Sequence, residues 1–132
     1  MLPSGLPEIV ADDEALARLL TSSSHFNATT VKPSAFLPNP KAGMTTSVFR
    51  HDAGNLIQLA RDRRPDVTVH GAAICKAAAV RSAKLDVIAE EPPPLHANIV
   101  GWPVNEADLV LQKAAQKERA LVITSKCKLV LF

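Results

Sequence analysis

The sequence predicts one α+β domain with a mixed or mostly antiparallel sheet and about four helices. A chain of 132 residues fits a single domain, and 47% hydrophobic residues are enough for one packed core without disulfides. Helical and strand-like stretches follow the order helix, two strands, two helices, two strands, helix, strand. Because doubly wound folds alternate strand and helix regularly, this order favours α+β.

The first element expected is a helix over residues 12–20, after a loose N-terminal segment over residues 1–8. Asp12 and Asp13 can cap the start of this helix, and the leucines that follow share one face at helical spacing.

A hairpin is expected next. Residues 29–37 are β-branched and aromatic enough to be extended, although Pro33 cannot donate to a ladder and restricts them to an edge or a bulge. Residues 45–50 alternate as a strand. The two stretches can therefore pair around the turn between them.

Two helices are expected in the middle of the chain. The first covers residues 55–64, where Asp52 can open the helix and Pro65 stops it. The second covers residues 72–84, where alanine dominates and a largely buried helix fits the pattern.

The C-terminal half predicts two strands, a helix and a last strand. The strands cover residues 85–89 and 96–102, on either side of three consecutive prolines. Asn105 can cap a helix that continues to about residue 119, and residues 120–132 alternate as a strand. Because this tail ends on an apolar run, we expect it to pair, either beside the 96–102 strand or with a second copy of the chain.

The net charge, the N-terminal residues and the length of the apolar runs favour a cytoplasmic protein. The net charge of +2 is spread along the chain, which falls short of the positive surface of a protein that holds DNA by phosphate neutralisation. The first residues lack the pattern of a signal peptide, and no apolar run reaches the roughly 18 residues that a membrane span needs. Cys75 and Cys127 form no disulfide framework and are expected to be small buried hydrophobes.

Four histidines are the candidate acid–base groups. They are expected at the edges of elements, where site residues concentrate. Two imidazoles with a nearby cation can cleave a phosphodiester without a metal: one takes a proton from a 2′-hydroxyl, one protonates the leaving oxygen, and the cation stabilises the transition state. The candidate catalytic residues are His25, Lys32, Arg50, His51, His70 and His96.

The sequence predicts no metal site and no cofactor. The histidines lack the short spacings typical of metal ligands, and the glycines are never close enough for a phosphate-binding loop. Trp102, at the end of a strand, and Phe132, at the end of the apolar tail, are the candidate partner-binding residues.

Four strings resemble those of a group of short uncharacterised bacterial proteins, over about residues 6 to 120. This resemblance implies a bacterial, single-domain, cytosolic protein and carries no activity. The strings are Ser23-Ser24-His25-Phe26, Val31-Lys32-Pro33-Ser34-Ala35-Phe36, Ser47-Val48-Phe49-Arg50 and His96-Ala97-Asn98-Ile99-Val100-Gly101-Trp102-Pro103.

Two functions follow as hypotheses. The first is a binding or accessory module that acts with a macromolecular partner, either another protein or a second copy of the chain, with nucleic acid as the alternative partner. It rests on the lack of a compact catalytic motif and on the apolar tail. The second is a metal-independent nuclease or phosphodiesterase that uses the histidines.

Overall fold

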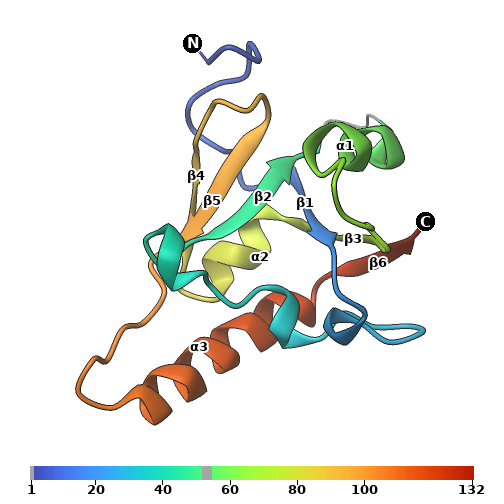
Figure 1. The fold of residues 1–132 in the computed structure, drawn as a ribbon. Coiled ribbons are helices and arrows are strands. Elements are labelled where there is room, and N and C mark those ends of the chain that lie inside the picture. The colour runs from blue at the N-terminus through green and yellow to red at the C-terminus, as the bar shows by residue number, and fades with distance from the viewer. Residues whose placement is uncertain (1, 52–54) are drawn as a thin grey trace.

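A six-stranded antiparallel sheet with strand order β4-β5-β2-β1-β3-β6 organises the molecule (Figure 1). The computed structural model describes residues 2–51 and 55–132. The predicted α+β class and antiparallel sheet are confirmed, with three α-helices in the described part of the chain. The strands are β1 Ala15–Leu20, β2 Thr46–Arg50, β3 Gly71–Lys76, β4 Asp86–Ala89, β5 His96–Val100 and β6 Lys128–Leu131, and the helices are α1 Leu56–Arg63, α2 Ala77–Ser82 and α3 Leu109–Thr124.

β1 replaces the helix expected over residues 12–20, so that prediction was wrong. All six residues of β1 pair with β3, and both faces of the strand are covered. Leu16 and Leu20 enter the core on one face, whereas Leu19 enters the core on the other. A strand buried on both faces has no two-residue alternation, and its leucines can match helical spacing by coincidence.

The alanine-rich stretch over residues 72–84 forms a strand and a short helix, so a single helix was also wrong. β3 lies between β1 and β6, and only the second half of the stretch coils, as α2. Ala72 and Ala73 are fully buried on opposite faces of β3. Pairing on both sides outweighs the helix propensity of alanine, which is worth only about 0.7 kcal/mol per residue or less.

The hairpin expected between residues 29–37 and 45–50 does not form. The first stretch contains a 3-10 turn at Pro33–Ala35, in which proline occupies the first position, where its missing N–H costs nothing. The second stretch is confirmed as β2, but its partners are β1 and β5.

The remaining elements agree with the sequence more closely. α1, β4 and β5 are confirmed, and α3 begins three residues later than expected because Asp108, not Asn105, caps it. Asp52, the expected cap of α1, lies outside the described residues, and Asn55 accepts from the first amides of that helix. The strand expected over residues 120–132 is confirmed only as β6, because α3 continues to Thr124. β6 pairs with β3, which corrects the expected position beside residues 96–102.

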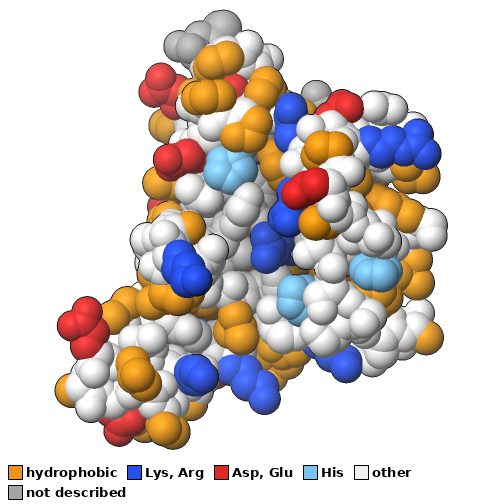
Figure 2. Space-filling view, viewed as in Figure 1, with side chains coloured by type: hydrophobic (Ala, Val, Ile, Leu, Met, Phe, Trp, Pro, Cys, Tyr) orange, Lys and Arg blue, Asp and Glu red, His pale blue; other side chains and the backbone are white. Residues whose placement is uncertain are grey.

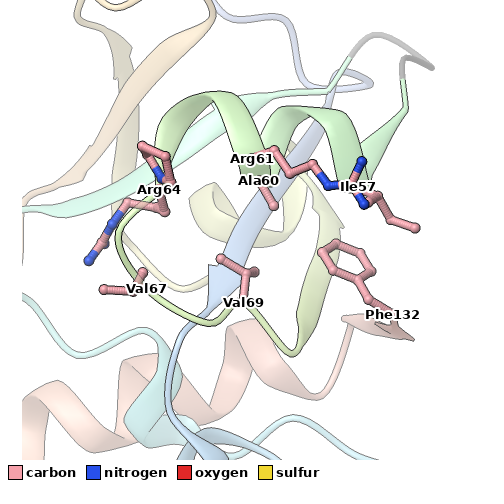
Figure 3. A pocket seen from close by; sticks show the side chains of 8 residues that line it. Ile57, Ala60, Arg61, Arg64, Val67, Val69 and Phe132 are labelled. Atoms are coloured by element: carbon pink, nitrogen blue, oxygen red, sulfur yellow. The ribbon is translucent and has the colours of Figure 1, made fainter.

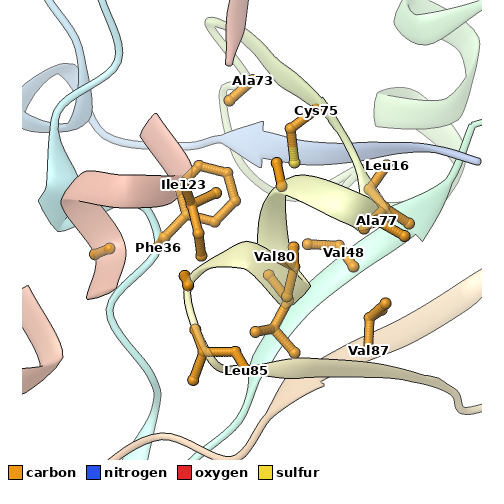
Figure 4. Close-up of a cluster of buried hydrophobic side chains, with 14 of the residues drawn as sticks. Leu16, Phe36, Val48, Ala73, Cys75, Ala77, Val80, Leu85, Val87 and Ile123 are labelled. Carbon is orange, nitrogen blue, oxygen red and sulfur yellow. The ribbon is translucent and has the colours of Figure 1, made fainter. Parts of the chain in front are cut away.

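Two cores lie on opposite faces of the sheet. The main core packs α2 and α3 against one face, with Phe36, Val80 and Ile123 converging at its centre (Figure 4). The smaller core packs α1 against the other face around Phe49 and Ala60. No helix in the described ranges is long and apolar enough to cross a membrane.

The segment before β1 is held against the sheet by hydrogen bonds and an ion pair. Ser4 bonds through its amide and hydroxyl to the Glu91 carboxylate. The Arg50 guanidinium donates to the Pro7 carbonyl. It also donates two 2.9 Å hydrogen bonds to the Glu14 carboxylate. These contacts tie part of the segment expected to be loose to β2 and to the β4–β5 connection.

Candidate functional site

A polar cleft of about 530 Å³ lies where β1 and β2 separate. These two strands pair only at Leu16 with Arg50 and at Ala17 with Phe49, so the rest of β1 diverges from β2. Figure 2 shows a hollow in this face, with histidine and arginine or lysine side chains around it. The polar cleft is lined by Arg18, Leu37, Asn39, Ala42, Thr45, Thr46, Ser47, Arg64, Glu90, Pro92, Pro93, His96 and Asn98.

Arg18 spans the gap between the separating strands. Its Nε donates to the Ala35 carbonyl and its Nη1 to the Ser47 carbonyl, both at 2.8 Å. Burial lowers the pKa of Arg18, and the positive charge of Arg64 lowers it further. Neither arginine forms an ion pair with a carboxylate in the described residues. The polar cleft therefore holds two neighbouring cations that form no ion pair in the described residues, although the acidic Glu90 is also part of its lining. This excess of positive charge favours an anionic ligand.

Ser47 and His96 form a hydrogen-bonded pair at the cleft surface. Ser47 lies opposite Asn98 in the β2–β5 ladder, so His96 is its diagonal neighbour on the same face. Ser47 Oγ lies 2.8 Å from His96 Nε2, and His96 Nδ1 lies 2.8 Å from the Glu90 carbonyl oxygen. A carbonyl only accepts, so a neutral His96 carries its proton on Nδ1. Nε2 is then the acceptor, and Ser47 must donate to it.

The His96 ring is also fixed by packing. Phe49, directly opposite His96 in the ladder, meets the imidazole edge to face, with centroids 5.6 Å apart and an interplanar angle of 60°. Arg63 lies over the Phe49 ring at 5.9 Å and donates to the Pro94 carbonyl. The imidazole is therefore oriented by a carbonyl, an aromatic ring and a hydroxyl, which is the arrangement that a base needs to activate a nucleophile.

The other candidate histidines lie outside the cleft lining. His25 is close enough to Arg18 for that charge to act on it: burial lowers the pKa of His25, and Arg18 lowers it further. His70 packs against Phe26 with ring centroids 5.7 Å apart, and its amide donates to the last residue of β1. The His51 amide donates to the first residue of β1. Six residues of strand span about 17–20 Å, so the backbones of His51 and His70 lie at opposite ends of β1.

The two candidate cations have different surroundings from those the sequence suggested. Lys32 is exposed, and its amide donates to the His25 carbonyl. Arg50 is 1% exposed, does not line the polar cleft, and is neutralised by Glu14. The arginines in the cleft are instead Arg18 and Arg64.

Trp102 and Phe132 also differ from each other. Trp102 is buried in the main core, and its Nε1 has no partner among the described residues. Phe132 is partly exposed and lines a mostly apolar pocket of about 370 Å³ between α1 and the end of β6 (Figure 3). Arg64 contributes to this pocket as well, but its guanidinium points away from Phe132.

Among the cleft residues, Arg18, Ser47, Arg64 and Asn98 were not site candidates in the sequence. Arg18 was assigned to a helix, in which a charged residue among leucines needs no explanation. The alternation of β2 places Ser47 on the face of Phe49, but the sequence does not show that β5 will bring His96 to that face. One signal was present: Arg18 lies within an otherwise apolar run over residues 15–20, and a buried arginine requires polar partners.

Comparisons with family models, with curated proteins and with solved structures give no match to this chain. Within the described ranges, no group of three or more histidine, cysteine, aspartate or glutamate side chains is placed to hold a metal ion. The case for a function therefore rests on the polar cleft.

Proposed function

We propose that this chain is a histidine-dependent phosphoesterase in which Ser47 is the nucleophile and His96 the general base. The observation that carries the proposal is the hydrogen-bonded series from Ser47 Oγ through His96 to the Glu90 carbonyl, inside a cleft with two arginines that form no ion pair in the described residues. This retains the phosphodiesterase hypothesis but replaces a pair of histidines with a serine–histidine pair.

The reaction divides into two displacements. Ser47 Oγ attacks phosphorus while its proton passes to His96 Nε2, an oxygen–phosphorus bond forms, and the leaving oxygen departs with the proton from His96. Water then gives a proton to His96 and attacks phosphorus, the Ser47 Oγ–P bond breaks, and His96 returns the proton to Oγ, which releases phosphate or a phosphomonoester and restores Ser47. The Glu90 carbonyl holds the proton on Nδ1 throughout, and it stabilises the imidazolium that forms.

Arg18 would provide the electrostatic part of catalysis. Its Nη1 donates to the backbone carbonyl of Ser47, so its guanidinium is held at the residue that carries the nucleophile before substrate arrives. A preorganised cation of this kind stabilises charge that develops on the phosphoryl oxygens. Arg64, which lies near enough to lower the pKa of Arg18, offers a second positive group for the same anion.

The test uses hydrolysis of bis(p-nitrophenyl) phosphate and of a single-stranded RNA oligonucleotide. Ser47→Ala and His96→Gln should each reduce kcat/KM by about 100-fold or more, because each removes a group that acts in the transition state. A fluorophosphonate probe should label Ser47 in the unmodified chain and not in the His96→Gln variant.

Matched controls are Ser34→Ala and His51→Gln, which change the same residue types outside the cleft lining. Both should hydrolyse substrate at the normal rate. If the Ser47 and His96 variants fold and hydrolyse both substrates as fast as the controls, the catalytic assignment is wrong.

Exposed apolar side chains at the start of α3 support a second candidate function, binding of a protein partner. Leu109, Val110 and Leu111 are consecutive and are 58–77% exposed, with Val104 close by in sequence at 55%. Exposed apolar clusters of this kind are typical of interaction surfaces. In sedimentation velocity, self-association that Val110→Glu removes and Glu118→Lys leaves intact would support a second copy as this partner. A monomer at every concentration would argue against self-association through this surface.

The bacterial source and cytoplasmic location stay part of the proposal. They are supported by the four sequence strings and by the composition of the chain. Fractionation of a bacterium that carries the gene is the direct test of location.

A further inference from the structure

We propose that Cys75 and Cys127 form a site of reversible oxidation, at which a hydroperoxide converts the two thiols into a disulfide that ties the α3–β6 turn to β3. Neither thiol belongs to the polar cleft, and the proposal is independent of the phosphoesterase activity.

The strand register places the two cysteines opposite each other. The β3–β6 ladder runs from Gly71 opposite Leu131 to Ile74 opposite Lys128, and the next pair in the same antiparallel register is Cys75 with Cys127. Facing residues of antiparallel strands have Cα atoms about 4.5–5.5 Å apart, which lies within the range of about 4.4–6.8 Å that disulfides span. Both side chains pack against the main core, so they also share a face.

The two thiols contact each other in the reduced protein. The Cys127 thiol hydrogen-bonds to Cys75 and lowers the pKa of the Cys75 thiol, against the opposing effect of burial. The pKa of Cys127 is raised by the same neighbour and by burial. In this proposal Cys75, which also lines a pocket, is the thiol that attacks the peroxide.

Cys75 is buried but borders a pocket that two lysines also line. Cys75 lines a pocket of about 470 Å³, together with Lys76 and Lys126. Lys126 is held in place by a 2.8 Å hydrogen bond from its ammonium group to Ser82 Oγ. Ammonium groups near a thiol stabilise the thiolate, which is the form that reacts with peroxides.

The chemistry balances in two steps. The Cys75 thiolate attacks one oxygen of hydrogen peroxide, the O–O bond breaks, and the released hydroxide takes a proton to become water. The sulfur of Cys127 then attacks the resulting sulfenic acid, an S–S bond forms, and the hydroxyl group leaves as water with the Cys127 proton. Two thiols lose two hydrogens, and one peroxide is reduced to two waters.

The experiment treats the reduced full chain with hydrogen peroxide under native conditions. Intact mass should fall by two hydrogens, both thiols should disappear from a thiol titration, and peptide mapping should find Cys75 linked to Cys127 within one molecule. The bond closes a long loop of chain, so Tm should rise by about 5 °C or more, and dithiothreitol should reverse every change.

Variants separate this reaction from general oxidation. Cys75→Ala and Cys127→Ala should each lose the intramolecular bond and the Tm increase, and the remaining thiol should give only sulfenic or higher acids. Lys126→Gln should slow disulfide formation several-fold. Lys128→Gln is the matched control, because Lys128 is exposed next to Cys127 but does not line the pocket.

Three results would overturn the proposal. They are sulfinic or sulfonic acid in place of the disulfide, cross-links only between molecules, and thiols that stay unreactive until the chain is unfolded in urea. Equal oxidation rates in the Lys126 and Lys128 variants would contradict the electrostatic part of it.

Discussion

Two arginines in neighbouring strands show how one residue type acquires different roles. Arg50 is buried but carries its own counter-ion, since Glu14 accepts from two of its nitrogens. The hydrogen bonds of Arg18 go to carbonyl oxygens. Its positive charge lowers the pKa of His25, and the charge of Arg64 lowers the pKa of Arg18. The first arginine stabilises the fold, whereas the second leaves positive charge available in the polar cleft.

The histidine beside Arg18 gives the first prediction. His25 should titrate below its ordinary value of 6.5 because burial and then the Arg18 charge disfavour its protonated form. Arg18→Gln should move the pKa of His25 back towards that value, as measured by NMR titration of the imidazole protons. The stability contribution of a neutral His25 is present above the unfolded-state pKa and is lost as pH falls through the lower folded-state pKa. An unchanged titration in the variant would show that burial alone sets the shift.

The buried ion pair gives the second prediction. Glu14→Ala should lower the free energy of unfolding by about 3 kcal/mol, because it leaves the Arg50 charge buried without a partner. Urea denaturation measures this value. Adding Arg50→Met to Glu14→Ala should recover much of the loss, and a double variant as unstable as the single one would mean that packing, not charge, is responsible.

At the scale of elements, β3 shows where local sequence stops being informative. Its alanines are strong helix formers, yet each is paired on both sides by strands from distant parts of the chain. The same holds for β1, whose leucines are buried on both faces. β2, β4 and β5 were predictable because their β-branched and aromatic residues alternate or lie between clear turns. The site was only partly predictable: His96 was found, but its partner and the arginines depend on which strands become neighbours.

Gly71 gives the third prediction, because β6 approaches it closely. A Cβ at this position would lie 2.3 Å from the Val130 carbonyl oxygen, which is too close for any side chain. Gly71→Ala should therefore push β6 off β3 and cost about 1–3 kcal/mol. Hydrogen exchange should rise in the amides of Lys128–Leu131 while the β2–β5 ladder stays protected. Thr68→Ala, at an exposed position just before β3, is the control.

At the scale of the whole molecule, the C-terminal segment completes both the sheet and the main core. β6 covers the outer edge of β3, and the last turns of α3 bring Ile123, which is fully buried, to the centre of the core. The apolar alternation at the end of the sequence indicated pairing correctly, but it could not indicate the partner, because antiparallel pairing depends on the complete topology.

Removal of residues 121–132 gives the fourth prediction. The truncated chain should lose about 4 kcal/mol or more of stability, since it loses the buried Ile123 and exposes the outer edge of β3. A truncation that begins after Cys127 should cost less, because it retains α3 and removes only β6. Thermal unfolding followed by circular dichroism compares the two, and equal Tm values for the full and the shorter chains would rule out a structural role for the tail.

The short contact between β1 and β2 divides the sheet mechanically. One half of the sheet contains β4, β5 and β2, and the other half contains β1, β3 and β6. Among the described residues, two β1–β2 pairs, Leu16 with Arg50 and Ala17 with Phe49, link the halves. Because few ladder hydrogen bonds join the two halves, we expect the sheet to be least stable at this link, where Arg18 connects β1 to the Ser47 carbonyl. A ligand that binds Arg18 and the Ser47 side of the cleft together would contact both halves of the sheet. Such a ligand should therefore increase the protection of the β1–β2 link against hydrogen exchange.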